Sequence, residues 1–119
     1  MSKPKYLIHC RDGVENLEGA TVSFLIGTTA AKRCETVVLL AAGASDFCVK
    51  GGADGLSVEG MEPLSDLINQ YVNDGGILWL CPVGAKVRGI TEDKLIKNAE
   101  FGGATKAMAY LESGATVLG

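Results

Sequence analysis

The sequence has a single histidine, few aromatic residues and no long hydrophobic run, and each shortage excludes a class of function. No stretch reaches the roughly 20 consecutive apolar residues that a membrane-spanning helix needs. One histidine and four widely spaced cysteines without a C-x-x-C pair give no pattern for a zinc site or a disulfide framework. We therefore expect free thiols, no metal ion and no insertion into a membrane.

Positive charge is also scarce. The chain has 11 Lys and Arg residues against 14 Asp and Glu residues, a net charge of −3, and no basic stripe. Nucleic acids and anionic membranes bind to clusters of positive charge, so the sequence predicts neither as a direct partner. The first residues lead into a short apolar run without the apolar core of a secretory signal, which predicts a cytoplasmic protein.

Motifs for nucleotide cofactors are absent as well. After the first apolar run the chain reads His9-Cys10-Arg11-Asp12-Gly13 instead of G-x-G-x-x-G, and the glycine-rich segments 51–55 and 102–106 lack P-loop spacing. We therefore expect no cofactor, and we expect these glycines to form turns with positive φ. Four loop carboxylates match no metal-binding loop and are expected to be solvated: Asp46, Asp54, Glu59 and Glu62.

What the sequence does contain is the pattern of one α/β domain over residues 1–119. Apolar residues make up 47% of the chain, which is enough for a core. The runs 6–8, 36–41 and 77–80 are continuously apolar, as in strands of a parallel sheet that are buried on both faces. Weaker patterns predict an edge strand at 98–101 and a fifth strand at 115–118.

Helical patterns alternate with these strands. Helical spacing of apolar residues predicts a long crossover helix over 14–33, and Gly19 and Gly27 within it suggest a close approach to the sheet or to a neighbouring subunit. Further helices are predicted from Pro63 to the stop at 73–76, from Cys81 to Gly89, and over 104–112. The alternation predicts a three-layer α/β/α domain with a five-stranded, mostly parallel sheet.

Cys81 is the leading candidate for chemistry. It closes the apolar run 77–80, and Pro82 follows at once. Proline is favoured at the first helical position, so Cys81 is expected near a helix N-cap, where backbone N–H groups favour negative charge and thiols ionise more readily. Lys86 and Arg88 could add positive charge nearby. The alternative is that Cys81 is a small hydrophobic residue at the end of a buried strand.

The other cysteines are sorted by their place relative to the strands. Ligands of open α/β sheets bind beyond the carboxyl ends of the strands. Cys10 and Cys48 follow the first two predicted strands, so each is a candidate second thiol or pocket residue, with core packing as the alternative. Cys34 precedes the second strand and is expected only to pack. His9 could orient or deprotonate a thiol, or could be purely structural.

The segment Cys81-Pro82-Val83-Gly84-Ala85-Lys86-Val87-Arg88-Gly89-Ile90, which follows a Gly-Gly pair and a buried strand, resembles the signature of the DsrE/DsrF-like family of small sulfur-relay proteins, which includes TusD-like members. The resemblance extends to the opening strand, the long first helix, the loop ending in Asp54-Gly55-Leu56 and the closing Ala-Thr-Val-Leu strand. It implies a flavodoxin-like domain that forms trimers or hexamers and carries sulfur as a persulfide at the position of Cys81. It also includes the C-x6-R-G spacing of Arg88, whose cation could stabilise a persulfide anion, bind a partner's acidic surface or only complement a helix C-terminus.

One departure from the resemblance is that Gly84 stands where some relatives have a second cysteine, so an intramolecular C-x-x-C cycle is excluded. Our first hypothesis is a persulfide carrier, sulfurtransferase-like if active, that works in a homo-oligomer between sulfur donor and acceptor proteins or small thiols. The alternative is a non-catalytic assembly or ligand-binding module in which Cys81 only lines an interfacial crevice. Rapid, pH-dependent alkylation of Cys81 distinguishes the first from the second. Peroxide reduction through a sulfenic acid is a weaker third hypothesis, because no resolving cysteine is evident.

Overall fold

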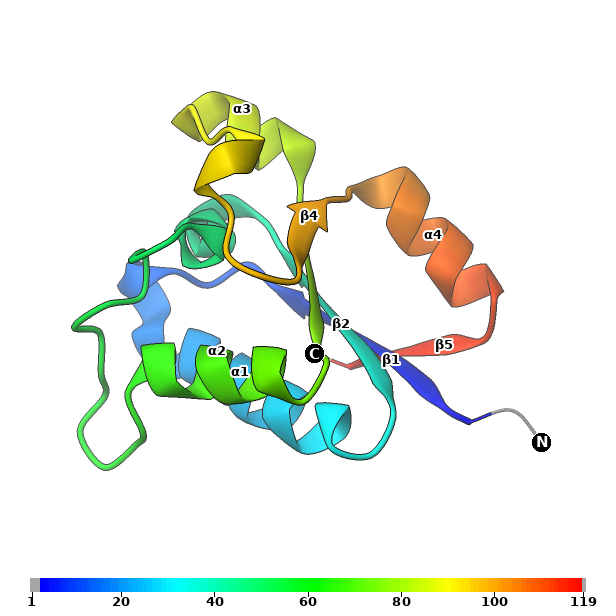
Figure 1. The fold of residues 1–119 in the computed structure, drawn as a ribbon, viewed down its shortest axis with the longest axis horizontal. Helices are drawn as coiled ribbons and strands as arrows, with labels where there is room; N and C mark the ends of the chain where they lie inside the picture. The colour runs from blue at the N-terminus through cyan, green and yellow to red at the C-terminus, as the bar shows by residue number, and fades with distance from the viewer. Residues whose placement is uncertain (1–2, 119) are drawn as a thin grey trace.

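A computed structural model describes residues 3–118 and contains one five-stranded sheet. The strands are β1 (Lys5–Cys10), β2 (Glu35–Leu40), β3 (Ile77–Leu80), β4 (Ala99–Phe101) and β5 (Ala115–Leu118), in the order β4-β3-β2-β1-β5 (Figure 1). All four strand pairings are parallel. The predicted five-stranded parallel sheet is therefore confirmed, with β4 at an edge.

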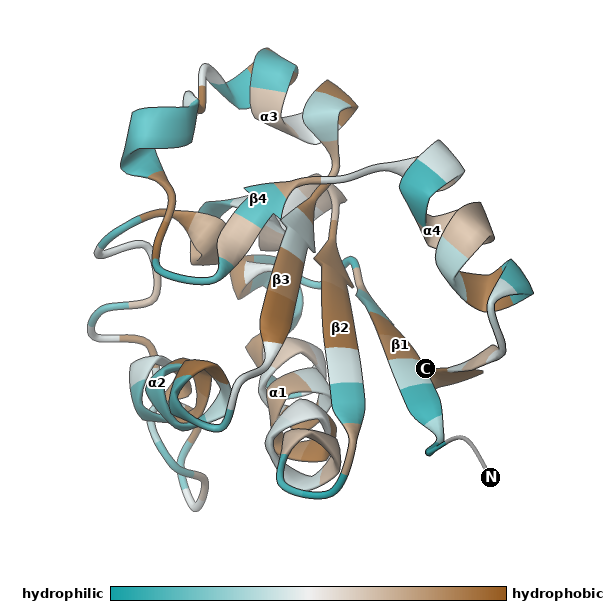
Figure 2. Ribbon diagram, turned by 45° about the vertical axis from the view of Figure 1, so that its right-hand side comes forward, coloured by the Kyte–Doolittle hydropathy of each residue, from teal (hydrophilic) through white to brown (hydrophobic). Residues whose placement is uncertain are grey.

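Helices cover both faces of this sheet, which confirms the three-layer α/β/α arrangement. The α-helices are α1 (Leu17–Ala31), α2 (Leu64–Asn73), α3 (Pro82–Arg88) and α4 (Ala104–Glu112), and the short 3-10 helices are η1 (Val14–Asn16), η2 (Ala42–Cys48) and η3 (Glu92–Lys94). Helices α1 and α2 lie on one face, α4 lies on the other, and α3 sits beyond the carboxyl ends of the strands (Figures 1 and 2). The helix predicted over 14–33 divides into η1 and α1.

The larger core lies between the sheet and helices α1 and α2. Phe24 of α1 meets Tyr71 of α2 edge to face, with ring centroids 6.0 Å apart. The buried Tyr71 hydroxyl lies 2.9 Å from the Thr36 carbonyl oxygen and 2.7 Å from that of Ile77, so it ties α2 to two strands. A Cβ on Gly27 would lie 3.3 Å from the β2 residue Val38, which confirms that this glycine brings α1 close to the sheet.

The opposite face of the sheet is covered less completely. Its small core joins alternate residues of three strands to α4, namely Leu7, Val37, Leu39, Trp79 and Ala107. Val117 of β5 pairs with Leu7, whose side chain belongs to this small core, yet Val117 is exposed. The β5 edge is therefore partly uncovered on this face.

The glycines at the start of α4 correct one prediction. Gly51 and Gly55 have the positive φ angles that we expected. Gly52, Gly102 and Gly103 do not, so the prediction is wrong for these three. For Gly102 and Gly103 the reason is visible. A Cβ on Gly102 would lie 2.9 Å from Cγ of Trp79, and one on Gly103 would lie 3.0 Å from Cδ of Pro82. These two glycines are needed for close approach between neighbouring segments, which a sequence pattern cannot distinguish from a turn.

Candidate functional site

Cys81 lies at the junction between β3 and α3. It is the N-cap residue of α3, and Pro82 occupies the first turn. The Cys81 N–H donates to the Leu40 carbonyl oxygen at 2.9 Å, and the Cys81 carbonyl accepts from Ala85 N–H at 3.1 Å. The backbone of Cys81 is thus fixed by both the sheet and the helix, while the side chain stays partly exposed.

A crevice of about 640 Å³ opens beside Cys81, between the first turns of α3 and α4. Side chains alternate between the faces of a strand, and Leu80 belongs to the core under α1 and α2, so Cys81 belongs to the α4 face. The close approach of Gly103 to Pro82 holds the two helix starts together. The remaining lining residues are Val83, Ala104, Thr105, Lys106 and Ala109.

Lys106 brings positive charge to this crevice, and the sequence did not identify it. Its Nζ lies 2.8 Å from Oε1 of Glu100 and 5.0 Å from the centroid of the Trp79 ring. The Trp79 indole N–H donates to the same Glu100 oxygen at 3.0 Å. The hydrogen bond from Lys106, followed by that from Trp79, lowers the pKa of Glu100, so this carboxylate stays charged and holds Lys106 in place.

Lys86 and Arg88 do not line the Cys81 crevice. Lys86 borders a separate depression, which it shares with Ile90 and Phe101. The Arg88 guanidinium lies 3.4 Å from the carbonyl oxygen of Gly84 in its own helix. The Arg88 side chain therefore reaches back toward the first turn of its own helix, and its role in the site stays a prediction.

Cys10 and Cys48 lie together in the core beneath α1 and α2. Both are fully buried, and burial raises the pKa of the Cys10 thiol and raises that of Cys48 to about 12. The sheet lies between these two thiols and the crevice that Cys81 lines on the α4 face. The structure thus brings Cys10 and Cys48 near each other and separates both from Cys81.

His9 and Cys34 also lie away from the crevice. His9 is half-buried in β1, and burial, followed by the charge of Arg11, lowers its pKa. Strand β2 separates β1 from β3, which puts the β1 and β3 backbones about 10 Å apart. Cys34 lies before β2, at the amino end of the strands, where its Sγ contacts the Ala30 carbonyl oxygen at 3.4 Å.

Within residues 3–118, no group of three or more His, Cys, Asp or Glu side chains is arranged to hold a metal ion. None of the described helices combines the length and apolar character needed to cross a bilayer. The polar groups that line the crevice include the Cys81 thiol, Lys106 and the backbone N–H groups at the start of α4, which have no partner within their own helix.

Comparison with known families decides how this crevice is interpreted. The DsrE/DsrF-like family model matches residues 4–119. The chain belongs to the DsrE/DsrF-like family. The resemblance noted in the segment around Cys81 is therefore confirmed, and membership suggests a function in sulfur relay at the level of the family.

Individual relatives of this DsrE/DsrF-like chain agree with its fold. The uncharacterized protein MJ0760 of Methanocaldococcus jannaschii is 31% identical over 101 residues, which cover 83% of this chain and 36% of MJ0760. The chain thus spans about a third of the length of that curated relative. The crystal structure of YchN from E. coli has a TM-score of 0.75 at 15% identity and covers 98% of this chain and 100% of YchN. The structure of MTH1491 from Methanobacterium thermoautotrophicum, a protein of unknown function, has a TM-score of 0.69 at 12% identity and covers 98% of both chains. These likenesses show the shared flavodoxin-like α/β fold.

Gly84 occupies the position at which the sequence resemblance expects a second cysteine in some relatives. A Cβ on Gly84 would lie 2.8 Å from Oγ of Ser45 in η2. The Ser45 side chain is fully buried, and its hydroxyl has no hydrogen-bond partner among the described residues. Any side chain at position 84 would press on Ser45, so the packing of α3 on η2 is adapted to glycine here.

Proposed function

We propose that this protein carries sulfane sulfur as a persulfide on Cys81, in a cytoplasmic sulfur relay. The observation that supports this most directly is the contrast among the thiols at the carboxyl edge of the sheet. Cys10 and Cys48 are fully buried, whereas Cys81 is partly exposed and lines an open crevice. Sulfur exchange requires a thiolate that its partner can reach.

The proposed reaction consists of two balanced exchanges. The Cys81 thiolate attacks the terminal sulfur of a donor persulfide, R–S–SH. A new S–S bond forms at Cys81, and the donor S–S bond breaks so that the donor leaves as the thiolate R–S⁻. An acceptor thiolate then attacks the terminal sulfur of the Cys81 persulfide and restores the Cys81 thiolate. No external oxidant or reductant is consumed.

The crevice provides groups suited to these steps. Lys106, whose Nζ is paired with Glu100, and the N–H groups at the start of α4 line a space in which we propose that negative charge moves between sulfur atoms. The side chains of Pro82, Val83 and Ala109 supply apolar walls. We propose that Lys106 stabilises the anionic sulfur, and that the donor and acceptor are proteins or small thiols.

Self-association is also part of the proposal. Val22, Leu25 and Ile26 are exposed on α1 with the spacing of a single helix face. Such an apolar stripe supports a homo-oligomer, which we propose to be a trimer or hexamer. Val83 and Val87 are also exposed on α3, beside the Cys81 crevice. These two residues favour the second candidate function, an assembly or ligand-binding module in which Cys81 only lines a crevice between subunits.

Mass spectrometry after brief exposure to polysulfide tests the carrier function. The wild type should gain one sulfur atom at Cys81, and a reductant should remove it. Cys81→Ser should gain none, while the control Cys34→Ser should behave as the wild type does. An adduct spread evenly over the four thiols, or no adduct, would refute the carrier function and leave the binding module.

Lys106→Gln tests the role of the lysine. The rate of Cys81 persulfidation should fall about three- to tenfold, because a partly exposed charge contributes on the order of 1 kcal/mol. Lys86→Gln is the matched control, because Lys86 borders a different depression. Equal rates for the two variants would refute the assignment of Lys106 while leaving the test of Cys81 intact.

A further inference from the structure

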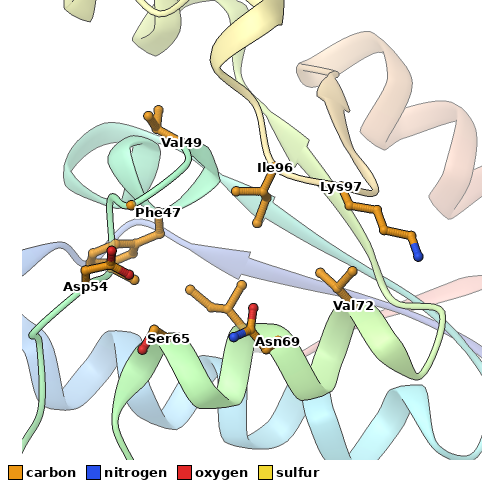
Figure 3. Close-up of a pocket in the computed structure, with 11 residues that line it drawn as sticks. Phe47, Val49, Asp54, Ser65, Asn69, Val72, Ile96 and Lys97 are labelled. Atoms are coloured by element: carbon orange, nitrogen blue, oxygen red, sulfur yellow. The ribbon is translucent and has the colours of Figure 1, made fainter.

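A second cavity, of about 130 Å³, lies on the other side of the molecule from α4 (Figure 3). Three segments enclose it: the chain from Phe47 to Asp54, helix α2, and the connection from α3 to β4 at Ile96 and Lys97. It shares no lining residue with the Cys81 crevice. The proposed sulfur relay makes no use of this cavity.

Backbone interactions hold the walls of the cavity in place. Ile96 N–H donates to the Cys48 carbonyl oxygen at 2.9 Å, and Val49 and Leu95 form an antiparallel bridge. The turn that ends at Asp54 is closed by its N–H, which donates to the Gly51 carbonyl oxygen at 3.2 Å. Gly51 has a φ of 78°, a value that glycine tolerates best. The cavity is therefore formed before any ligand arrives.

The polar groups of the lining are spread along the cavity, from Asp54 and Ser65 at one end to Asn69 near its middle (Figure 3). Figure 3 shows Asp54 beside Phe47, with Ser65 and Asn69 on the neighbouring turns of α2. The Asp54 carboxylate forms no ion pair with any residue of the range 3–118. Lys97 lies at the opposite rim, with its ammonium group directed away from the space (Figure 3). The charged group that a ligand inside the cavity would contact is therefore the negative Asp54 carboxylate.

The rest of the lining is apolar. Ile68 and Val72 of α2 line the cavity. Ile96 points toward α2 from the opposite side (Figure 3). A closed apolar cavity of about 150 Å³ in another protein holds a benzene-sized molecule. The depression here is of similar volume but open to solvent, so it has room for a hydrocarbon chain of about four carbons whose polar head stays near the exposed Asp54.

We propose that this cavity binds a short aliphatic amine as its ammonium cation. The ammonium group pairs with the Asp54 carboxylate, and Ser65 and Asn69 supply further polar groups along the lining. The alkyl chain packs between Ile68 and Ile96. Asp54 therefore has a binding role in addition to being the solvated loop charge that its sequence context predicts.

Titration followed by ¹H–¹⁵N NMR tests this site, with butylammonium as the probe and with butanol and butyrate as ligands of similar size and different charge. Butylammonium should shift the amide signals of the lining segments in a saturable manner. Its affinity should exceed that of butanol about fivefold, the effect of one partly exposed ion pair, and butyrate should bind more weakly still.

Asp54→Asn should remove this preference and weaken butylammonium binding about fivefold, because only the charge is lost. Glu59→Gln is the matched control, since it removes an exposed loop carboxylate that does not line the cavity. Equal affinities for the three probes, unchanged binding by Asp54→Asn, shifts that map elsewhere, or the absence of a saturable shift would each overturn the proposal.

Discussion

Replacing Gly84 by alanine should destabilise the protein, although alanine is the better helix former. In a helix interior the exchange of glycine for alanine stabilises by up to about 1 kcal/mol. Here the new methyl group would lie 2.8 Å from the buried Ser45 Oγ. Overpacking of this kind costs about 1–3 kcal/mol. We expect the free energy of unfolding to fall by about 1 kcal/mol, the difference between these two effects.

The double variant isolates the cause. In Ser45→Ala the hydroxyl is gone, and the next contacts of the new methyl group are at ordinary distances, 3.7 Å to Nη1 of Arg88 and 3.8 Å to the backbone nitrogen of Ala42. In that background Gly84→Ala should therefore stabilise the protein by up to about 1 kcal/mol. Ser45→Ala alone should be neutral or slightly stabilising, because it removes a buried hydroxyl without a partner.

Urea denaturation of the wild type, both single variants and the double variant gives the coupling free energy between the two positions. We expect a coupling of about 1–3 kcal/mol. If Gly84→Ala changes stability equally in both backgrounds, the contact with Ser45 does not explain the need for glycine at this position. The explanation of the missing second cysteine by packing would then be wrong.

Three other predictions follow from the buried groups. Tyr71→Phe should lower the free energy of unfolding by about 1–3 kcal/mol in urea denaturation, because two strand carbonyls lose the hydroxyl group that they contact. Tyr6→Phe is the control and should change the free energy of unfolding little, because the Tyr6 hydroxyl makes no hydrogen bond among the described residues. The raised pKa of Cys48, about 12, means that its stabilising contribution is complete below about pH 9 and is lost as the pH rises toward 12. Cys48 alone should contribute a fall of about 1.4 kcal/mol per pH unit in that window, on top of the contributions of Cys10, Tyr71 and Tyr110, whose pKa values are also raised. Cys48→Ala should reduce the slope by that amount, and an unchanged slope would contradict the assignment. Iodoacetamide at neutral pH should modify Cys81 long before Cys10 or Cys48, as peptide mapping would detect, and equal rates would contradict the burial of the latter two.

Much of the fold can be predicted from the sequence, because a parallel sheet buries its central strands on both faces and so leaves continuous apolar runs. The run at 77–80 and the proline at 82 together predict the strand, the junction and the helix around Cys81, and the structure has all three. The end of α3 at Gly89 can also be predicted from the sequence, because the residue there has a left-handed conformation, with φ of 67°, that favours glycine.

The surroundings of Cys81 could not be predicted in the same way. Lys106 is 25 positions away and reaches the crevice only because Gly102 and Gly103 let the start of α4 lie against Trp79 and Pro82. The sequence instead suggested Lys86, a near neighbour along the chain that lies beside another depression. Proximity along a chain is a poor guide at the carboxyl edge of a sheet, where loops from different strands meet.

The face of the sheet on which each thiol lies could not be predicted either. Cys10 ends β1 and Cys81 follows β3, and a strand that ends one residue earlier or later presents its last side chain to the opposite face. Only the pairing register places Cys10 with Leu40 beneath α1 and α2, while Cys81 lies one position beyond Leu80 and so belongs to the α4 face.

The sheet lies between Cys81 and the two buried thiols of Cys10 and Cys48. This separation would protect a persulfide on Cys81 from attack by those thiols. A persulfide beside a free thiol discharges itself, because the thiolate attacks, a disulfide forms and hydrosulfide escapes. Cys10 and Cys48 are buried in the core on the other face of the five-stranded sheet, and Cys34 lies at the opposite end of the strands. A sulfur atom on Cys81 would then be transferred only to a molecule that enters the crevice. The shape of the crevice entrance would therefore determine which acceptor can take the sulfur.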